Sequence, residues 1–146
     1  MAPLTKKAEQ SEATRQQLLK IARRLFATRG YAESSIAEIV ERANVTRGAL
    51  YHHFESKQDV FRAVYEDIQR ELAESFYQAA MRQPNVGKRL EVGCEAFLDA
   101  CLDRGLQRIV LVDSPSVLGW DYWHEIDEKY SLGHMQDALK AAMKEG

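Results

Sequence analysis

Residues 33–57 read ESSIAEIVERANVTRGALYHHFESK, and this stretch predicts two short helices joined by a tight turn. Ser35, followed three residues later by Glu38, marks the start of the first helix because such a pair can form a capping box. The apolar residues of this helix keep the i, i+3, i+4, i+7 spacing of one helix face; they are Ile36, Ile39, Val40 and Ala43.

The second helix begins almost at once. Asn44 and Val45 interrupt the apolar pattern, and Thr46 is a favourable N-cap for a new helix. Leu50 and Phe54, four residues apart, then face the core. Because the connection is so short, the two helices must cross sharply, as they do in a helix-turn-helix unit. Such a unit places side chains of its second helix in the major groove of DNA.

The outer face of this second helix carries side chains that suit DNA. Arg47 can bond guanine bidentately, and Thr46 can reach a phosphate oxygen or a thymine methyl group. Gly48 costs a helix interior about 1 kcal/mol relative to Ala, but it lets the backbone approach a bulky partner. Three further side chains can donate to phosphates or pack on sugars: Tyr51, His52 and His53. Each alone could be a solvated surface residue, but their combination after this turn favours DNA contact.

Lys57 stands in the first turn of the next helix, after the N-cap residue Ser56. A lysine at a helix N-terminus opposes the helix dipole. A bound anion nearby, such as a DNA phosphate, would account for its position.

A further helix precedes this unit and ends at Gly30. Its apolar residues repeat the helical spacing; they are Leu18, Ile21, Ala22, Leu25 and Phe26. Lys6 and Lys7, followed by Arg15, predict a flexible basic arm over residues 1–13. This arm either follows the DNA duplex or is a disordered tail without a role.

Residues 15–61 resemble the DNA-binding domain of the TetR family of bacterial transcriptional repressors. The resemblance is carried by GYAESSIAEIVERANVTRGALYHHFESKQDVF, which begins at Gly30. It implies a homodimer on a palindromic operator in double-stranded DNA, released by a small-molecule effector. It also implies eight residues at positions where the family usually touches DNA: Ser35, Thr46, Arg47, Gly48, Tyr51, His52, His53 and Lys57.

Charge is divided between the two parts of the chain. Residues 1–57 contain 10 Lys and Arg against 6 Glu, net +4, whereas residues 58–146 contain 10 against 16 Asp and Glu, net −6; together they give −2. A basic N-terminal part favours the phosphate backbone, and an acidic remainder limits nonspecific binding. With no apolar run that could span a bilayer and no signal-peptide pattern at its start, we expect a cytoplasmic protein with no membrane partner.

After Lys57 the pattern predicts one long helix, which QPNVG at residues 83–87 interrupts, and then further helices. The run RIVLV at residues 108–112 could be a strand by itself, but the chain offers no partner strand, so we expect helix. A last helix is predicted over 132–143, with Met135, Leu139 and Met143 on one face. The fold class is therefore all-α: a helix-turn-helix domain over residues 1–57 and a helical effector-binding and dimerisation domain over 58–146.

The second domain contains residues that suit an apolar ligand pocket with a polar handle. RIVLVDSPSVLGWDYWHEID also resembles the ligand domains of some actinobacterial-type members of the TetR family. Ordinary core is the alternative for each candidate. The ligand-binding candidates are Phe97, Cys101, Trp120, Tyr122, Trp123 and His124.

Other chemistry finds no support in the sequence. Cys94 and Cys101 lie about 10 Å apart on a straight helix, too far for a disulfide. His124 and its acidic neighbours lack the i, i+4 pairing of a zinc helix. Because there is also no phosphate loop or nucleophile elbow, we expect no enzymatic activity, no metal and no cofactor.

Members of the TetR family usually continue for some tens of residues beyond this length, and their last helices form the dimer. The chain ends at Gly146, so it is either a fragment or dimerises differently. Three hypotheses remain: a ligand-responsive repressor, an effector-independent DNA-binding regulator or architectural protein, and a ligand-binding or catalytic domain with a vestigial helix-turn-helix. The sequence favours the first, but names neither the operator, the effector nor the sign of regulation.

Overall fold

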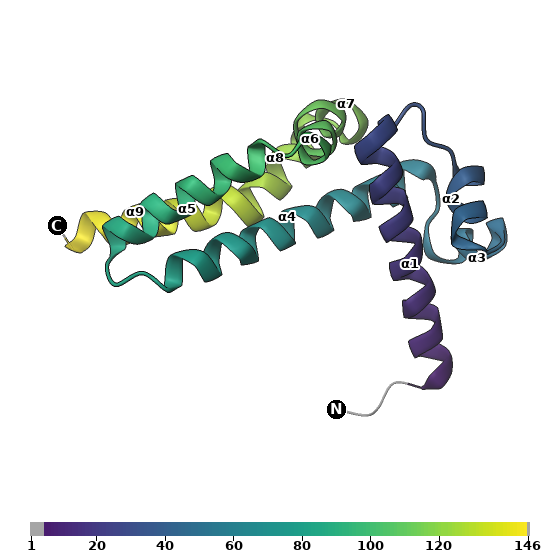
Figure 1. The fold of residues 1–146 in the computed structure, drawn as a ribbon, viewed down its shortest axis with the longest axis horizontal. Helices are drawn as coiled ribbons and strands as arrows, with labels where there is room; N and C mark the ends of the chain where they lie inside the picture. The colour runs from purple at the N-terminus through teal and green to yellow at the C-terminus, as the bar shows by residue number, and fades with distance from the viewer. Residues whose placement is uncertain (1–4, 146) are drawn as a thin grey trace. The chain divides into compact units, whose positions relative to one another are not determined.

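The computed structural model describes residues 5–145, and no strand occurs among them. The chain divides into two compact units, Met1–Val64 and Tyr65–Gly146. The α-helices are labelled in Figure 1. The helices in chain order are α1 Lys6–Arg29, α2 Ile36–Ala43, α3 Arg47–His53, α4 Lys57–Met81, α5 Val86–Cys101, α6 Arg104–Leu106, η1 Gln107–Asp113, α7 Ser114–Leu118, α8 Trp120–Asp127, η2 Glu128–Leu132 and α9 Gly133–Glu145. The predicted all-α fold class is confirmed. Within residues 5–145, no helix is both long and apolar enough to cross a membrane.

Helix α1 begins much earlier than its apolar pattern indicates. We expected a flexible arm over residues 1–13, but the chain is helical from Lys6 onward. The Thr5 hydroxyl caps the helix by accepting a hydrogen bond from the Ala8 N–H at 3.3 Å, and Glu9 stands in the first turn, where an acidic side chain favours the helix dipole. Residues 1–4 of the expected arm lie outside the described residues.

Unit 1 is held together by a cluster of aromatic rings. The Phe61 ring centroid lies 5.1 Å from that of Phe26 and 5.2 Å from that of Tyr31, both in edge-to-face geometry. Val60, Phe61 and Val64 of α4 are all buried. Because the first two turns of α4 pack into this core, the compact unit extends to Val64.

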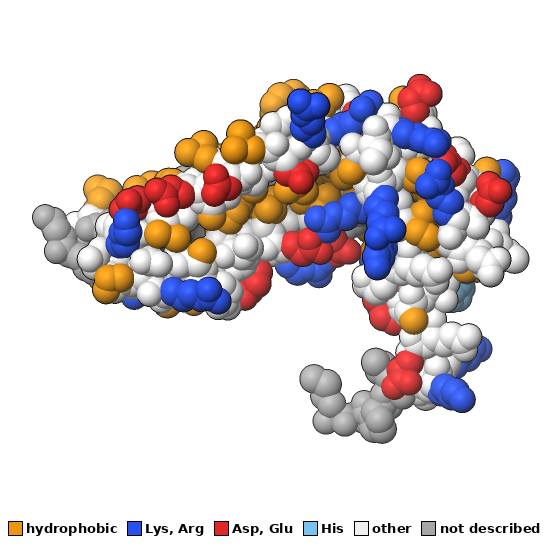
Figure 2. Space-filling view, in the orientation of Figure 1, with side chains coloured by type: hydrophobic (Ala, Val, Ile, Leu, Met, Phe, Trp, Pro, Cys, Tyr) orange, Lys and Arg blue, Asp and Glu red, His pale blue; other side chains and the backbone are white. Residues whose placement is uncertain are grey.

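Unit 2 contains the rest of α4 and all later helices. Helices α5 and α9 lie against one another. Residues 108–112 are helical as predicted, but they belong to the π-helix η1. The i to i+5 hydrogen bonds of a π-helix are rare in proteins, and where they occur they often lie at functional sites. The predicted last helix corresponds to α9; the side chains of Leu132 and Met135 lie outside those described. Hydrophobic side chains remain at the surface along α5 (Figure 2). Leu98 of this helix and Leu102, its C-cap residue, are both exposed.

Candidate functional site

Three local hydrogen-bonding arrangements build the helix-turn-helix. The Ser35 hydroxyl accepts from the Glu38 N–H at 3.2 Å and caps α2. Asn44 ends that helix with φ 54, in the left-handed region that Asn tolerates better than most residues. The Thr46 hydroxyl accepts from the Ala49 N–H at 3.1 Å and caps α3. Both predicted caps and the predicted turn are therefore confirmed.

In a capping box the Glu38 side chain would accept a hydrogen bond from the backbone N–H of Ser35. In the structure this side chain pairs with two arginines. Its two carboxylate oxygens pair with Arg29 and Arg42, each at 2.8 Å. These ion pairs link the end of α1 to both turns of α2. Because they are exposed, each contributes only a few tenths of a kcal/mol to about 1 kcal/mol.

Helix α3 is fixed from its inner face. Leu50 is fully buried and Phe54 is 3% exposed. The Arg15 guanidinium lies 5.4 Å from the centre of the Phe54 ring. The Gln17 amide donates to the Ala43 carbonyl at 3.0 Å, which ties α1 to the end of α2 just before the turn. The outer face of α3 is therefore held in a defined orientation.

The predicted DNA-contact residues lie where a partner can reach them. Tyr51 is 51% exposed, although a tyrosine ring usually buries most of its surface. An added Cβ at Gly48 would meet only the Thr46 hydroxyl, at 3.8 Å, so unit 1 itself does not require glycine there. Ser35 lies outside α3, at the N-terminus of α2. The exposed members of the predicted set are Ser35, Thr46, Arg47, Gly48, Tyr51 and His52.

His53 is half-buried at the edge of this face. Its ring centroid lies 5.1 Å from that of His52. Burial lowers the pKa of His53 below its usual 6.5, and the nearby His52 and Arg15 lower it further. The lowered pKa favours the uncharged imidazole, which would offer DNA a hydrogen-bonding group without adding positive charge.

Lys57 has structural partners that its position in the sequence does not reveal. Its ammonium donates to the Tyr31 carbonyl at 2.9 Å and to the Ser34 carbonyl at 3.0 Å, and it lies 4.1 Å from the centre of the Tyr31 ring. These contacts explain a lysine at the start of α4 without a bound anion, which corrects the argument made from the helix dipole. An ammonium has three donors, so one is left for a phosphate.

Replacing Lys57 with Met should lower the free energy of unfolding by about 1–3 kcal/mol even without DNA, because two carbonyls lose a charged donor. Urea denaturation of the variant measures this loss. Lys20, exposed on α1, provides the matched control, and Lys20→Met should have little effect. Equal midpoints for Lys57→Met and the parent protein would show that these hydrogen bonds contribute nothing.

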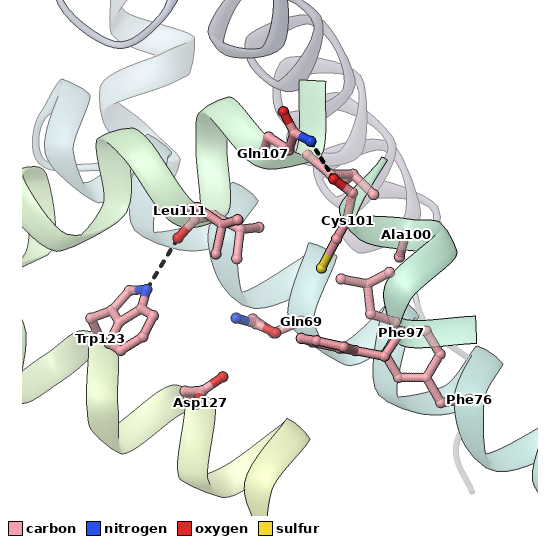
Figure 3. A pocket seen from close by; sticks show the side chains of 12 residues that line it. Gln69, Phe76, Phe97, Ala100, Cys101, Gln107, Leu111, Trp123 and Asp127 are labelled. Carbon is pink, nitrogen blue, oxygen red and sulfur yellow. Dashed lines mark hydrogen bonds between the residues drawn. The ribbon is translucent and has the colours of Figure 1, made fainter. Parts of the chain in front are cut away.

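Unit 2 contains a partly open cavity of about 180 Å3 (Figure 3). Its lining comes from α4, α5, α6, η1 and α8 and is mostly apolar. The lining residues are Gln69, Leu72, Phe76, Phe97, Ala100, Cys101, Leu106, Gln107, Val110, Leu111, Trp123 and Asp127. The structure therefore brings three of the predicted ligand-binding residues together: Phe97, Cys101 and Trp123.

The other three predicted ligand-binding residues are not among those that line this cavity. Trp120 is 67% exposed and packs edge-on against Trp123, with ring centroids 5.0 Å apart. The Tyr122 hydroxyl donates to the Glu66 carboxylate, and His124 is exposed on α8. Tyr122 and His124 adjoin Trp123 in the sequence, and because a helix turns by about 100° per residue they cannot share the direction in which Trp123 points.

Sequence reasoning missed the polar residues of the cavity. Gln69 is 2% exposed, and its amide donates to the Tyr65 hydroxyl at 2.9 Å. Gln69 follows Tyr65 by four residues and precedes Leu72 by three. This spacing places it on the apolar face of α4 and could have identified it as an inward-facing residue. Asp127 follows Trp123 by four residues and thus lies on the same face of α8.

Burial changes the acidity of two groups in this region. It raises the pKa of the Asp127 carboxyl above the usual 3.8, against a smaller opposite effect of His124. It also raises the pKa of Tyr65 to about 12; the Gln69 hydrogen bond opposes this shift, and the Asp127 charge adds to it. The ionised form of Asp127 is therefore disfavoured in the folded protein.

We expect Asp127→Asn to raise the thermal midpoint of the protein at pH 7. The pKa of Asp127 is raised on folding, so ionisation of this carboxyl lowers the free energy of unfolding when the pH is above the folded-state pKa. This loss of stability disappears when the pH falls below about 3.8, the usual pKa of the carboxyl in the unfolded chain. The advantage of the variant should therefore shrink as the pH falls toward 4. Thermal melts across this range, with the exposed Asp121→Asn as control, measure it; an advantage that persists below pH 4 would contradict the assignment.

Two family models match the chain. "Bacterial regulatory proteins, tetR family" matches residues 18–64, and "Tetracyclin repressor-like, C-terminal domain" matches residues 88–146. The TetC protein of transposon Tn10 in Escherichia coli is 30% identical over 137 residues, which cover 94% of this chain and 69% of TetC. The chain belongs to the TetR family. The resemblance inferred from residues 15–61 is thus confirmed, and the chain is a helix-turn-helix transcriptional regulator of that family.

Solved structures of TetR-family regulators share the fold. A TetR-family transcriptional regulator from Pectobacterium atrosepticum is 32% identical, with a TM-score of 0.78 over 94% of this chain and 70% of that one. SmeT, in complex with triclosan, is 27% identical, with a TM-score of 0.67 over 90% of this chain and 66% of SmeT. Two further relatives are the HTH-type transcriptional regulators AcrR of Shigella flexneri and TtgR of Pseudomonas putida, which are 44% and 40% identical. The matches cover only 30% of AcrR and 29% of TtgR.

Proposed function

We propose that this TetR-family chain is a repressor that binds a palindromic operator as a homodimer and leaves it when a small molecule occupies the cavity of unit 2. The observation that carries the proposal is the outer face of α3. Its polar side chains are exposed around a glycine that packing within unit 1 does not require. A surface of this kind suits close approach to the edges of bases and the phosphate backbone.

The charge distribution supports DNA as the partner. The net charge of +4 over residues 1–57 favours phosphates. A helix-turn-helix reads a short half-site, so pairing two copies across a two-fold axis supplies the specificity that one copy lacks. A chain that regulates transcription acts in the cytoplasm of a bacterium, where its operator lies.

The cavity supports control by a small molecule. It is lined mainly by apolar side chains and has a few polar groups, which is the usual make-up of a ligand site. SmeT, a structural relative, binds triclosan. Binding to the operator-free form alone would shift the equilibrium away from DNA.

The test combines an operator with candidate effectors. DNA sites selected from a random pool by the purified protein are placed at a reporter promoter, and fluorescence anisotropy follows release of the same sites by a library of small apolar compounds. Reporter repression together with release by at least one compound is the expected result. Repression without release would favour an effector-independent regulator, activation would reverse the sign, and ligand binding without DNA affinity would indicate a vestigial helix-turn-helix.

The Gly48→Ala variant separates DNA contact from folding. Alanine should stabilise α3 by up to about 1 kcal/mol, because the added methyl group has room in unit 1. The same methyl group should obstruct the close approach of α3 to DNA, so operator affinity falls while the urea midpoint rises or stays unchanged. Anisotropy and denaturation measure the two effects; unchanged affinity would mean that Gly48 does not face the operator.

A further inference from the structure

The cavity of unit 2 has one charged side chain among the described residues that line it, and this is Asp127. Apart from Gln69 and Gln107, the rest of the lining is apolar. No described Lys or Arg forms an ion pair with Asp127. His124, on the same helix, acts on it only as a nearby charge. A carboxylate in such a wall favours a ligand that brings the missing positive charge.

Three hydrogen-bond donors of the lining are directed at the protein itself. The Gln107 amide donates to the Cys101 carbonyl, and the Trp123 indole N–H donates to the Val110 carbonyl at 3.1 Å. The Gln69 amide donates to the Tyr65 hydroxyl. In Figure 3, Asp127 and Gln69 point toward one another across the cavity. The cavity therefore offers a ligand an anionic acceptor rather than a cationic donor.

Size and ring content narrow the ligand further. A cavity of about 180 Å3 slightly exceeds the roughly 150 Å3 engineered cavity that binds benzene. It accommodates one ring with a short side chain. Phe76, Phe97 and Trp123 contribute aromatic rings to its wall, and such rings attract cations through their π faces. The net charge of −6 over residues 58–146 also favours the approach of cations.

We propose that the cavity binds a small lipophilic ammonium ion, a single ring carrying a protonated amine that pairs with the Asp127 carboxylate. This assignment rests on the proposed function, because it names the chemical class of the effector for the same cavity. An ammonium ion satisfies the carboxylate with a charge-assisted hydrogen bond, while its ring replaces water against the apolar wall. An anion of the same size would place two negative charges together.

Three probes of similar shape test the charge preference: 2-phenylethylamine, propylbenzene and 3-phenylpropionate. Calorimetric titrations of the purified chain at pH 7 should show 2-phenylethylamine binding at least about tenfold more tightly than propylbenzene. The affinity for 3-phenylpropionate should be the lowest of the three. Asp127→Asn should remove the preference for the amine and keep the affinity for propylbenzene. Asp121→Asn, exposed on the same helix and outside the cavity lining, should leave the preference intact.

Equal or tighter binding of propylbenzene or 3-phenylpropionate would overturn the assignment, as would an unchanged preference in Asp127→Asn or no binding of the amine. Operator release separates this result from the proposed function. An amine that binds through Asp127 without releasing the operator supports the ligand class and counts against ligand-controlled repression. Release by uncharged or anionic compounds, with the amine inactive, supports repression and rejects the ligand class.

Discussion

Replacing Arg47 with Ala is expected to lower operator affinity by about 10- to 100-fold, the effect of losing one bidentate contact to a base. Arg47 is the first residue of α3 and is exposed. Its removal should leave the free energy of unfolding nearly unchanged, because an exposed side chain contributes little to stability. Fluorescence anisotropy on the selected operator and urea denaturation measure the two quantities separately.

Arg24→Ala is the matched control, because Arg24 is also exposed but lies on α1. It makes the same change in net charge, so any general loss of attraction to phosphates appears in both variants. Raising the salt concentration should weaken both by the same electrostatic effect. If the two variants bind the operator equally well, Arg47 acts only as a general positive charge and not as a base contact.

The second large effect is expected at Phe61, which joins α4 to the aromatic cluster of unit 1. Phe61 is fully buried and contacts the rings of Phe26 and Tyr31. Truncation to Ala should cost about 3–5 kcal/mol, a large share of the 5–15 kcal/mol that stabilises a typical domain. Operator binding should therefore be lost, although no DNA-contact residue is altered.

Urea denaturation of Phe61→Ala measures this cost, and Phe97→Ala provides the comparison. Phe97 is already 41% exposed and lies in unit 2, so the same truncation there removes less buried area and should cost much less. Phe61→Leu should recover most of the stability and the DNA binding. Equal costs at the two sites would contradict the view that the aromatic cluster holds unit 1 together.

The helix-turn-helix could be predicted from the sequence because its signals are local. Ser35 and Thr46 each cap a helix through a backbone N–H three residues away. Asn44 ends α2 in the left-handed region, which an asparagine tolerates without any distant partner. Leu50 and Phe54 face inward by helical spacing alone. Where the partners of a residue are within one helical turn, the pattern determines the structure.

The parts that could not be predicted depend on residues distant in sequence or on a change of helical type. Lys57 reaches carbonyls 23 and 26 residues away, which no local pattern indicates. The first turns of α1 contain few apolar residues, so periodicity placed the helix start too late although Thr5 caps it. Around the cavity, η1 departs from the 3.6-residue period, so the spacing rule cannot assign which of its side chains face inward.

The central claim is that the outer face of α3 reads a two-fold symmetric operator. Its most direct test is to select bound sites from a random DNA pool with the parent protein and with Arg47→Ala. The parent should enrich two inverted half-sites. The variant should lose sequence preference at one symmetric pair of positions and keep it elsewhere, because one side chain reads the same base in each half. Enrichment of sites without two-fold symmetry, or an identical preference for both proteins, would contradict the account.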